Sequence, residues 1–230
     1  MSHGKSSMKI GVDAVLLASW VNGNPKKILD VGTGCGVISL ILAQRFNDCE
    51  ILGIDIDEAS VEEAITNMEN SPWRDNCHAE IAQFPDAPAI KGQKFDLIIS
   101  NPPYFSSGID CPHSPREKAR HQGSLSVFSL LKESSPFLNA HGILAFIFPF
   151  EFLEDVKGYA KNFGWIAQRI CRIRDNDGRP YKRVMMELKL NENNGSISQN
   201  WENVHELTLF SEGKPTEEYR ILCHDFYLRF

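Results

Sequence analysis

The chain has 230 residues, of which 42% are hydrophobic, and a formal net charge of -6 at pH 7. This length and apolar content predict a single globular domain over residues 1–230 with a sizeable core, and they exclude a disordered chain. The negative charge excludes a uniformly basic coat for nucleic acid, but it leaves room for a local basic patch.

Short apolar runs alternate with helical patterns over the first two thirds of the chain. The runs with the composition of strands are KKILDV, EILGIDI, FDLIIS and GILAFIFP. This alternation predicts a doubly wound, mostly parallel sheet with helices on both faces. The continuous apolar character of ILDV and LIIS suits strands that are buried on both sides.

The pattern changes after Phe152. We expect a helix through Lys161, two strands near WIAQRICRIR and RVMMELKL, a further segment HELTLF, and a closing helix in TEEYRILCHDFYLRF. Residues 191–200 have the composition of a linker, and 191–230 is expected to be a C-terminal extension of the same domain. The whole predicts an α/β fold with a seven-stranded sheet whose last strand pair is antiparallel.

A glycine-rich turn follows the first predicted strand. In ILDVGTGCGVISL the strand ends at Asp30, and three glycines precede the next helix: Gly32, Gly34 and Gly36. Such glycines let a ligand approach the backbone closely. A dinucleotide fingerprint would need glycine at Val37, whereas the spacing D-x-G-x-G-x-G resembles motif I of the class I S-adenosylmethionine-dependent methyltransferases. An ordinary tight turn is the alternative.

The next predicted strand, ILGIDI, ends in an acidic residue. Asp55 lies about 20 residues beyond the glycines, where a carboxylate can accept hydrogen bonds from both hydroxyls of a ribose. We expect Asp55 and the adjacent Ile56 to contact a nucleoside cofactor. Asp57 is better explained as the N-cap of the helix EASVEEA.

The motif NPPY follows the strand FDLIIS. Prolines end a strand because they lack a backbone N–H, so the carbonyls here point away from the ladder. The class I family uses this motif to methylate exocyclic or amide nitrogens. The Asn101 side-chain oxygen and the Pro102 carbonyl would accept the two N–H bonds of such an amine, and Tyr104 would stack on the base. A rigid surface turn is the alternative.

Several further segments resemble one family. These are MKIGVDAVLLASW, the N-x-x-x-S-P-W element from Asn67 to Trp73, SPREKAR and the C-terminal FYLRF. Together with motif I and NPPY, they resemble the bacterial tRNA1(Val) adenine-N6-methyltransferases over almost the whole chain. The resemblance implies a Rossmann-like class I fold, S-adenosylmethionine as cofactor, S-adenosylhomocysteine as product, and N6-methylation of the adenosine just 3′ of the anticodon, at position 37.

The resemblance also assigns cofactor residues outside motif I. In the family the segment matching MKIGVD closes over the cofactor, so residues 1–20 would cover it, and Lys9, Gly11 and Asp13 are candidates. Asp13 suits the N-cap of the helix AVLLASW equally well. After the third strand many relatives carry an acid that contacts the cofactor's adenine. Here Gln83 stands beside Phe84, and an amide can also pair with an adenine edge.

Two basic segments are candidates for contact with tRNA phosphates. SPREKARH contributes Arg116, Lys118 and Arg120. The segment 169–183 contributes six more cations: Arg169, Arg172, Arg174, Arg179, Lys182 and Arg183. Such concentrations in a chain of negative net charge favour phosphate contacts. The alternative is a solvated face in which Glu117, Asp175 and Asp177 pair with these cations.

Other partners are not indicated by the sequence. Six cysteines without a C-x-x-C pair and seven histidines without metal-ligand spacing predict reduced thiols and no metal. No apolar run approaches a membrane span, and the N-terminus lacks the apolar region of a signal peptide, so we expect a cytoplasmic protein with no membrane contact. No protein partner is evident.

Three alternative functions remain open. NPPY also occurs in rRNA guanine-N2 methyltransferases and in protein glutamine-N5 methyltransferases, so the substrate is less specified than the reaction. A third possibility is an RNA-binding module with a vestigial cofactor site. The presence of Asp30, Asp55 and Asn101 argues against the third possibility, because a vestigial site need not keep all three.

Overall fold

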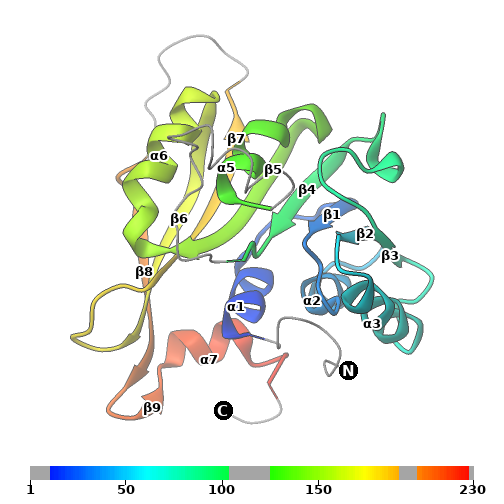
Figure 1. Cartoon of the computed structure of the whole chain (residues 1–230). Helices are drawn as coiled ribbons and strands as arrows, with labels where there is room; N and C mark the ends of the chain where they lie inside the picture. The colour runs from blue at the N-terminus through cyan, green and yellow to red at the C-terminus, as the bar shows by residue number, and fades with distance from the viewer. Residues whose placement is uncertain (1–10, 104–124, 192–200, 228–230) are drawn as a thin grey trace.

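A computed structural model describes residues 11–103, 125–191 and 201–227, and these form one α/β unit around a single sheet (Figure 1). The sheet has nine strands in the order β3-β2-β1-β4-β5-β7-β6-β8-β9. The strands are β1 (Lys27–Val31), β2 (Glu50–Asp55), β3 (Cys77–Ile81), β4 (Phe95–Ser100), β5 (Leu138–Pro149), β6 (Trp165–Asn176), β7 (Arg183–Leu190), β8 (Val204–Ser211) and β9 (Lys214–Pro215).

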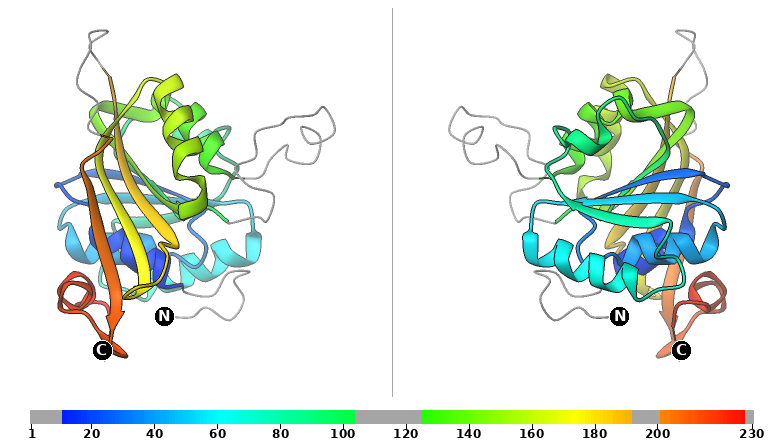
Figure 2. Two further views of the ribbon diagram at one scale, coloured as in Figure 1. Left: turned by 90° about the vertical axis from the view of Figure 1, so that its left-hand side faces the viewer. Right: turned by 90° about the vertical axis from the view of Figure 1, so that its right-hand side faces the viewer.

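Helices cover both faces of the sheet. They are α1 (Val12–Trp20), α2 (Val37–Arg45), α3 (Glu58–Glu69), α5 (Val127–Glu133), α6 (Leu153–Asn162) and α7 (Glu217–Cys223), with short 3-10 turns η1 (Pro88–Ile90), η2 (Ser135–Phe137) and η3 (Phe150–Phe152). Helices α1, α2, α3 and α7 contribute to the core on one face, and α5 and α6 to the core on the other (Figure 2). None of the helices within the described ranges could cross a bilayer.

The first half of the sheet is parallel, as the sequence predicts. Strands β3, β2, β1, β4 and β5 are all parallel to one another. The chain leaves β1 toward β2 and β3, then returns to place β4 on the other side of β1. The order of strands therefore reverses at β1, and in open α/β sheets ligands bind at the carboxyl edge of such a switch point.

The second half of the sheet has more strands than the sequence predicted. Strand β7 is antiparallel to β5 and to β6, which confirms the antiparallel pair, but β8 and β9 extend the sheet from seven expected strands to nine. Strand β8 runs parallel to β6, and β9 closes a hairpin on β8. The apolar residues of β8 alternate with polar ones, as suits a strand near an edge with one face in solvent, and this weakens its apolar signal.

Two helix starts test the capping predictions. Asp57 is the N-cap of α3 and accepts a hydrogen bond from the Ser60 amide at 3.1 Å, as predicted. The alternative prediction that Asp13 is the N-cap of α1 is wrong, because Gly11 occupies that position and Asp13 lies in the first turn. The Asp13 carboxylate instead accepts a hydrogen bond from Arg183 at 2.7 Å. That ion pair ties α1 to β7.

Candidate active site

The carboxyl ends of β1, β2 and β4 lie side by side. Parallel pairing places Asp30 opposite Gly53, two residues before Asp55, and opposite Ile99, two residues before Asn101. The glycine turn after β1, the acid at the end of β2 and the asparagine after β4 therefore meet at one edge of the sheet. This edge is the switch point of the fold, where a ligand is expected.

Strand β4 is fastened to β1 at this edge. The Ser100 hydroxyl, which is fully buried, donates a hydrogen bond to the Val31 carbonyl at 2.7 Å. Asn101 is the next residue and is half-buried, and Pro102 after it is buried. The bond from Ser100 fixes where NPPY begins relative to the glycine turn. Sequence reasoning missed Ser100, since a serine at a strand end carries no distinguishing signal by itself.

Asp30 is the central buried group of the turn. Its Oδ2 accepts hydrogen bonds from the Thr33 hydroxyl at 2.8 Å and the Ser39 hydroxyl at 2.7 Å. Its Oδ1 is buried and has no hydrogen-bond partner among the described residues. Burial raises the pKa of Asp30 to about 6, against the lowering effect of the two hydroxyls. This oxygen can therefore accept a hydrogen bond from a donor that reaches it.

Strand β2 holds the turn from the other side. One carboxylate oxygen of Asp55 accepts from the Gly34 amide at 2.9 Å, and the other accepts from the Asp57 amide at 3.1 Å. The Ile54 carbonyl accepts from the Gly32 amide at 2.8 Å. Each Asp55 oxygen keeps a lone pair, so this carboxylate can still receive the two hydroxyls of a ribose.

The three glycines have the backbone that the motif requires. Gly32, Gly34 and Gly36 have φ values of +73°, +55° and +83°, in the left-handed region that favours glycine. A Cβ on Gly32 would lie 2.8 Å from the Leu125 side chain, and one on Gly36 would lie 3.2 Å from Met68. The turn is thus closely covered from two sides, and the motif I assignment agrees with its geometry.

Two further residues support the turn, and the sequence analysis gave them no such role. Gly53 in β2 lies against Thr33, because a Cβ there would be 2.7 Å from the Thr33 hydroxyl. Asn67 in α3 donates a buried hydrogen bond to the Cys35 carbonyl at 3.0 Å. A glycine inside an apolar strand often marks a close backbone approach, so ILGIDI did contain the signal for Gly53.

The candidates for adenine contact lie beside Asp55. Ile56 is 61% exposed, and Ile81, which pairs with Asp55 in the β2–β3 register, is 56% exposed. Gln83 is exposed and Phe84 is half-buried. Two large exposed isoleucines next to Asp55 form an apolar surface that a purine can cover. Ile81 was not predicted; only its place at the end of a strand could have indicated it.

Some predicted residues lie outside the described part of the chain. They are Lys9, Tyr104, Arg116, Lys118 and Arg120, and their roles stay predictions. Gly11 is described and is exposed at the start of α1.

The arginines of 169–183 are divided between two places. Arg183 is 16% exposed and pairs with both Asp13 and Asp175, which agrees with the salt-bridged alternative. Arg174 pairs with Glu206 at 2.7 Å. Arg179 is exposed in the turn between β6 and β7. We therefore assign Arg183 to the packing of α1 on the sheet.

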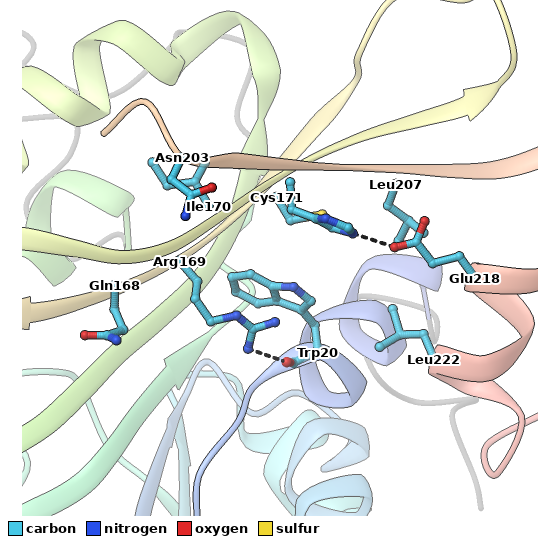
Figure 3. A pocket seen from close by; sticks show the side chains of 10 residues that line it. Trp20, Gln168, Arg169, Ile170, Cys171, Asn203, Leu207, Glu218 and Leu222 are labelled. Atoms are coloured by element: carbon cyan, nitrogen blue, oxygen red, sulfur yellow. Dashed lines mark hydrogen bonds and ion pairs between the residues drawn. The ribbon is translucent and has the colours of Figure 1, made fainter. Parts of the chain in front are cut away.

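Arg169 lies within β6, where it pairs with Glu187 of β7, and it packs on the C-terminal end of α1. Its guanidinium is 4.1 Å from the centre of the Trp20 ring, and it donates to the Trp20 carbonyl at 3.0 Å (Figure 3). It also pairs with Glu187, whose pKa burial raises. Trp20 and Arg169 border a pocket of about 390 Å³ that is also lined by residues of β6, β8 and α7. Its arginine holds α1 to the sheet.

No metal cluster is present in the described part of the chain: no group of three or more histidine, cysteine or acidic residues there could hold an ion. The five described cysteines are free and buried, and burial raises the pKa of Cys77 and of Cys171 to about 12 in each case. Their thiols are therefore neutral at physiological pH and suited to packing.

The fold and this site define a class I methyltransferase. A methyltransferase domain family matches residues 23–209. Among solved structures, a predicted O-methyltransferase from Agrobacterium tumefaciens superposes with a TM-score of 0.65 at 16% identity, covering 93% of this chain and 96% of that one. A ribosomal protein L11 methylase from Lactobacillus delbrueckii subsp. bulgaricus gives a TM-score of 0.53 at 15% identity, covering 78% and 77%.

Sequence relatives narrow the family. A tRNA1(Val) (adenine(37)-N6)-methyltransferase of Photorhabdus laumondii subsp. laumondii is 34% identical, covering 99% of this chain and 92% of the relative. The protein of the same name from Bacteroides thetaiotaomicron is 35% identical, covering 98% and 93%. The chain belongs to the tRNA1(Val) (adenine(37)-N6)-methyltransferase family, as the sequence motifs predicted.

The contact of Gly53 with Thr33 yields a first prediction. Gly53→Ala should lower the free energy of unfolding by about 1–3 kcal/mol, because the new methyl group displaces a stiff threonine that is bonded to Asp30. Urea denaturation measures the effect. Gly158→Ala is the matched control: apart from its own helix turn, no atom of the described residues lies within 4 Å of a Cβ at this position of α6. It should stabilise by about 0.5–1 kcal/mol. Equal effects of the two changes would contradict the account of the turn.

The ion pairs of Arg183 yield a second prediction. Arg183→Ala should lower the free energy of unfolding by about 1.5–3 kcal/mol, since two carboxylates lose a charged hydrogen-bond partner in a part-buried place. The exposed Arg179→Ala should change it by less than about 0.5 kcal/mol. Denaturation curves that coincide for the two variants would remove the structural role of Arg183.

Proposed function

We propose that the protein transfers the methyl group of S-adenosylmethionine to N6 of adenine 37 in tRNA1(Val). The observation that carries the proposal is the register of β1, β2 and β4, which brings Asn101 beside the glycine turn and Asp55. The relatives named for this activity, which align with nearly the whole chain, support the choice of substrate.

The residues at the switch point fit the methyl donor. Asp55 would accept hydrogen bonds from its ribose hydroxyls, and the surface of Ile56 would contact its adenine, with Gln83 and Phe84 beside it. The buried Oδ1 of Asp30, to which no residue in the described ranges donates, provides an acceptor close to the glycine turn. When bound, S-adenosylmethionine supplies an electrophilic methyl group on a sulfonium.

NPPY would bind the acceptor amine. The lone pair of an adenine N6 amine is delocalised into the ring, so the amine is a weak nucleophile. The Asn101 side-chain oxygen and the Pro102 carbonyl would accept its two N–H bonds and favour the pyramidal geometry of attack. A general base is not required, because the proton can leave after the nitrogen has gained the methyl group. Stacking by Tyr104 stays a prediction.

One experiment separates this function from the alternatives. The protein is incubated with labelled S-adenosylmethionine and the tRNA, ribosomal RNA and protein of a strain that lacks the modification, and the RNA is then digested to nucleosides and the protein to amino acids. We expect the label in N6-methyladenosine from position 37. Label in a guanosine, in protein glutamine or in no product would contradict the proposal in favour of a guanine-N2 enzyme, a glutamine-N5 enzyme or a binding module.

Cofactor binding yields a third prediction. Asp55→Ala should weaken binding of S-adenosylmethionine by about 1.5–3 kcal/mol, because a charged acceptor of hydrogen bonds is lost and the Gly34 amide loses its partner. Isothermal calorimetry measures the affinity, and the exposed Asp75→Ala serves as the control for a lost negative charge. An unchanged affinity for Asp55→Ala would exclude Asp55 from the site.

Catalysis yields a fourth prediction. Asn101→Ala should leave the affinity for S-adenosylmethionine nearly unchanged and lower the single-turnover rate of methylation by about a hundredfold or more, since the lost acceptor acts on the reacting amine. Rapid-quench measurement of methylated tRNA gives the rate. A variant that methylates at the parent rate would show that Asn101 has no catalytic role.

A further inference from the structure

Two aromatic rings and two guanidinium groups form a continuous cluster at the end of β6. We call Phe150, Arg172, Arg174 and Tyr181 the stacking platform. The rings of Phe150 and Tyr181 are 5.3 Å apart between centres. The Arg174 guanidinium lies 4.2 Å from the centre of the Tyr181 ring, and that of Arg172 lies 5.9 Å from both rings. These are distances of aromatic and cation–π contact.

Three segments of the chain hold the platform. The Phe150 amide donates to the Lys182 carbonyl at 2.9 Å, which joins the end of β5 to the residue after Tyr181. Arg172 and Arg174 are two residues apart in β6, so their side chains lie on the same face of the sheet. Arg174 donates to the Tyr181 hydroxyl and to Glu206 of β8. The Tyr181 ring is therefore fixed before any ligand arrives.

The platform stands at the same edge of the sheet as the active site. Ser100 of β4 pairs with Phe146 of β5, and β5 continues in the same direction to Pro149, the residue before Phe150. The platform thus begins about 10 Å beyond the row of Asn101, at ~3.3 Å per residue. Strand β6 lies three places from β4, or about 14 Å at the usual spacing of ~4.8 Å. Nucleotides that flank a base bound at Asn101 can reach this distance.

The platform has unused binding capacity. All four of its side chains are only partly buried. The Arg172 side chain forms no hydrogen bond or ion pair with any residue in the ranges that the structure covers, and its Nε is buried without a partner. Two arginines face one carboxylate, Glu206, so the cluster keeps a positive charge. Flat rings beside a free guanidinium suit a ligand with a π-face and a negative charge.

We infer that the stacking platform binds an unpaired base of the RNA next to the base that is methylated. This inference rests on the proposed function, because it takes the same RNA as substrate. Unpaired bases stack on aromatic rings and on arginine planes, whereas their phosphates attract the free guanidinium. A basic surface of a protein partner would be repelled by Arg172 and Arg174. The platform positions the RNA and does not touch the reacting atoms.

The test uses a synthetic anticodon stem-loop and versions of it with one abasic nucleotide at each loop position in turn. Tyr181→Leu removes the aromatic ring, and Tyr181→Phe keeps the ring as the matched control. For Tyr181→Leu we expect a loss of affinity for the stem-loop of about 5- to 150-fold, the range of one stacking contact. Tyr181→Phe should stay within about twofold, and both variants should bind S-adenosylmethionine like the parent.

The abasic series identifies the stacked base. At one loop position, removal of the base should weaken binding to the parent but should not weaken binding to Tyr181→Leu any further, because the two changes remove the same contact. If Tyr181→Leu binds every RNA with the parent's affinity, or if no position shows this coupling, the inference is overturned. Failure of the proposed function is distinguishable, since the parent would then not methylate the intact stem-loop.

Discussion

The buried carboxylate of Asp30 is the group on which the site depends. It is fully buried, and Thr33 and Ser39 donate to the same oxygen. Through Thr33 it fixes the glycine turn, and through Ser39 it fixes the start of α2. Gly53 is small because Thr33 must lie against it. One acid thus aligns three neighbouring elements at the carboxyl edge.

This arrangement has a cost for the free protein. The pKa of Asp30 rises from 3.8 to about 6 on folding, mainly through burial. Between about pH 4 and pH 6 the folded chain therefore binds more protons than the unfolded chain, so stability falls as the pH rises through this window. The ionised group costs on the order of 3 kcal/mol at neutral pH. A ligand that donates to Oδ1 would offset part of that cost, which couples cofactor binding to the stability of the turn.

The two halves of the sheet have different tasks in this account. The parallel strands β1, β2 and β4 converge on the donor site, whereas the antiparallel strands carry the arginines and aromatic rings beyond it. The sequence indicated the first half well, because Asp30, the glycines, Asp55 and NPPY follow strands whose ends must meet in a parallel sheet. It indicated the second half less well. Arg183 faces a carboxylate, whereas Arg172 faces a ring. Which of these an arginine faces depends on how β6 and β7 pair, and the sequence of either strand alone does not show this pairing.

The most direct test of the role of Asp30 is the affinity for S-adenosylhomocysteine as a function of pH, measured by calorimetry for the parent and for Asp30→Asn. The asparagine can still accept from Thr33 and Ser39, but it cannot ionise. The account predicts that the parent binds more tightly as the pH rises through about 6 and then levels off, and that the variant shows no such change. A parent affinity that is flat across this range, or an equal pH dependence in both proteins, would contradict it.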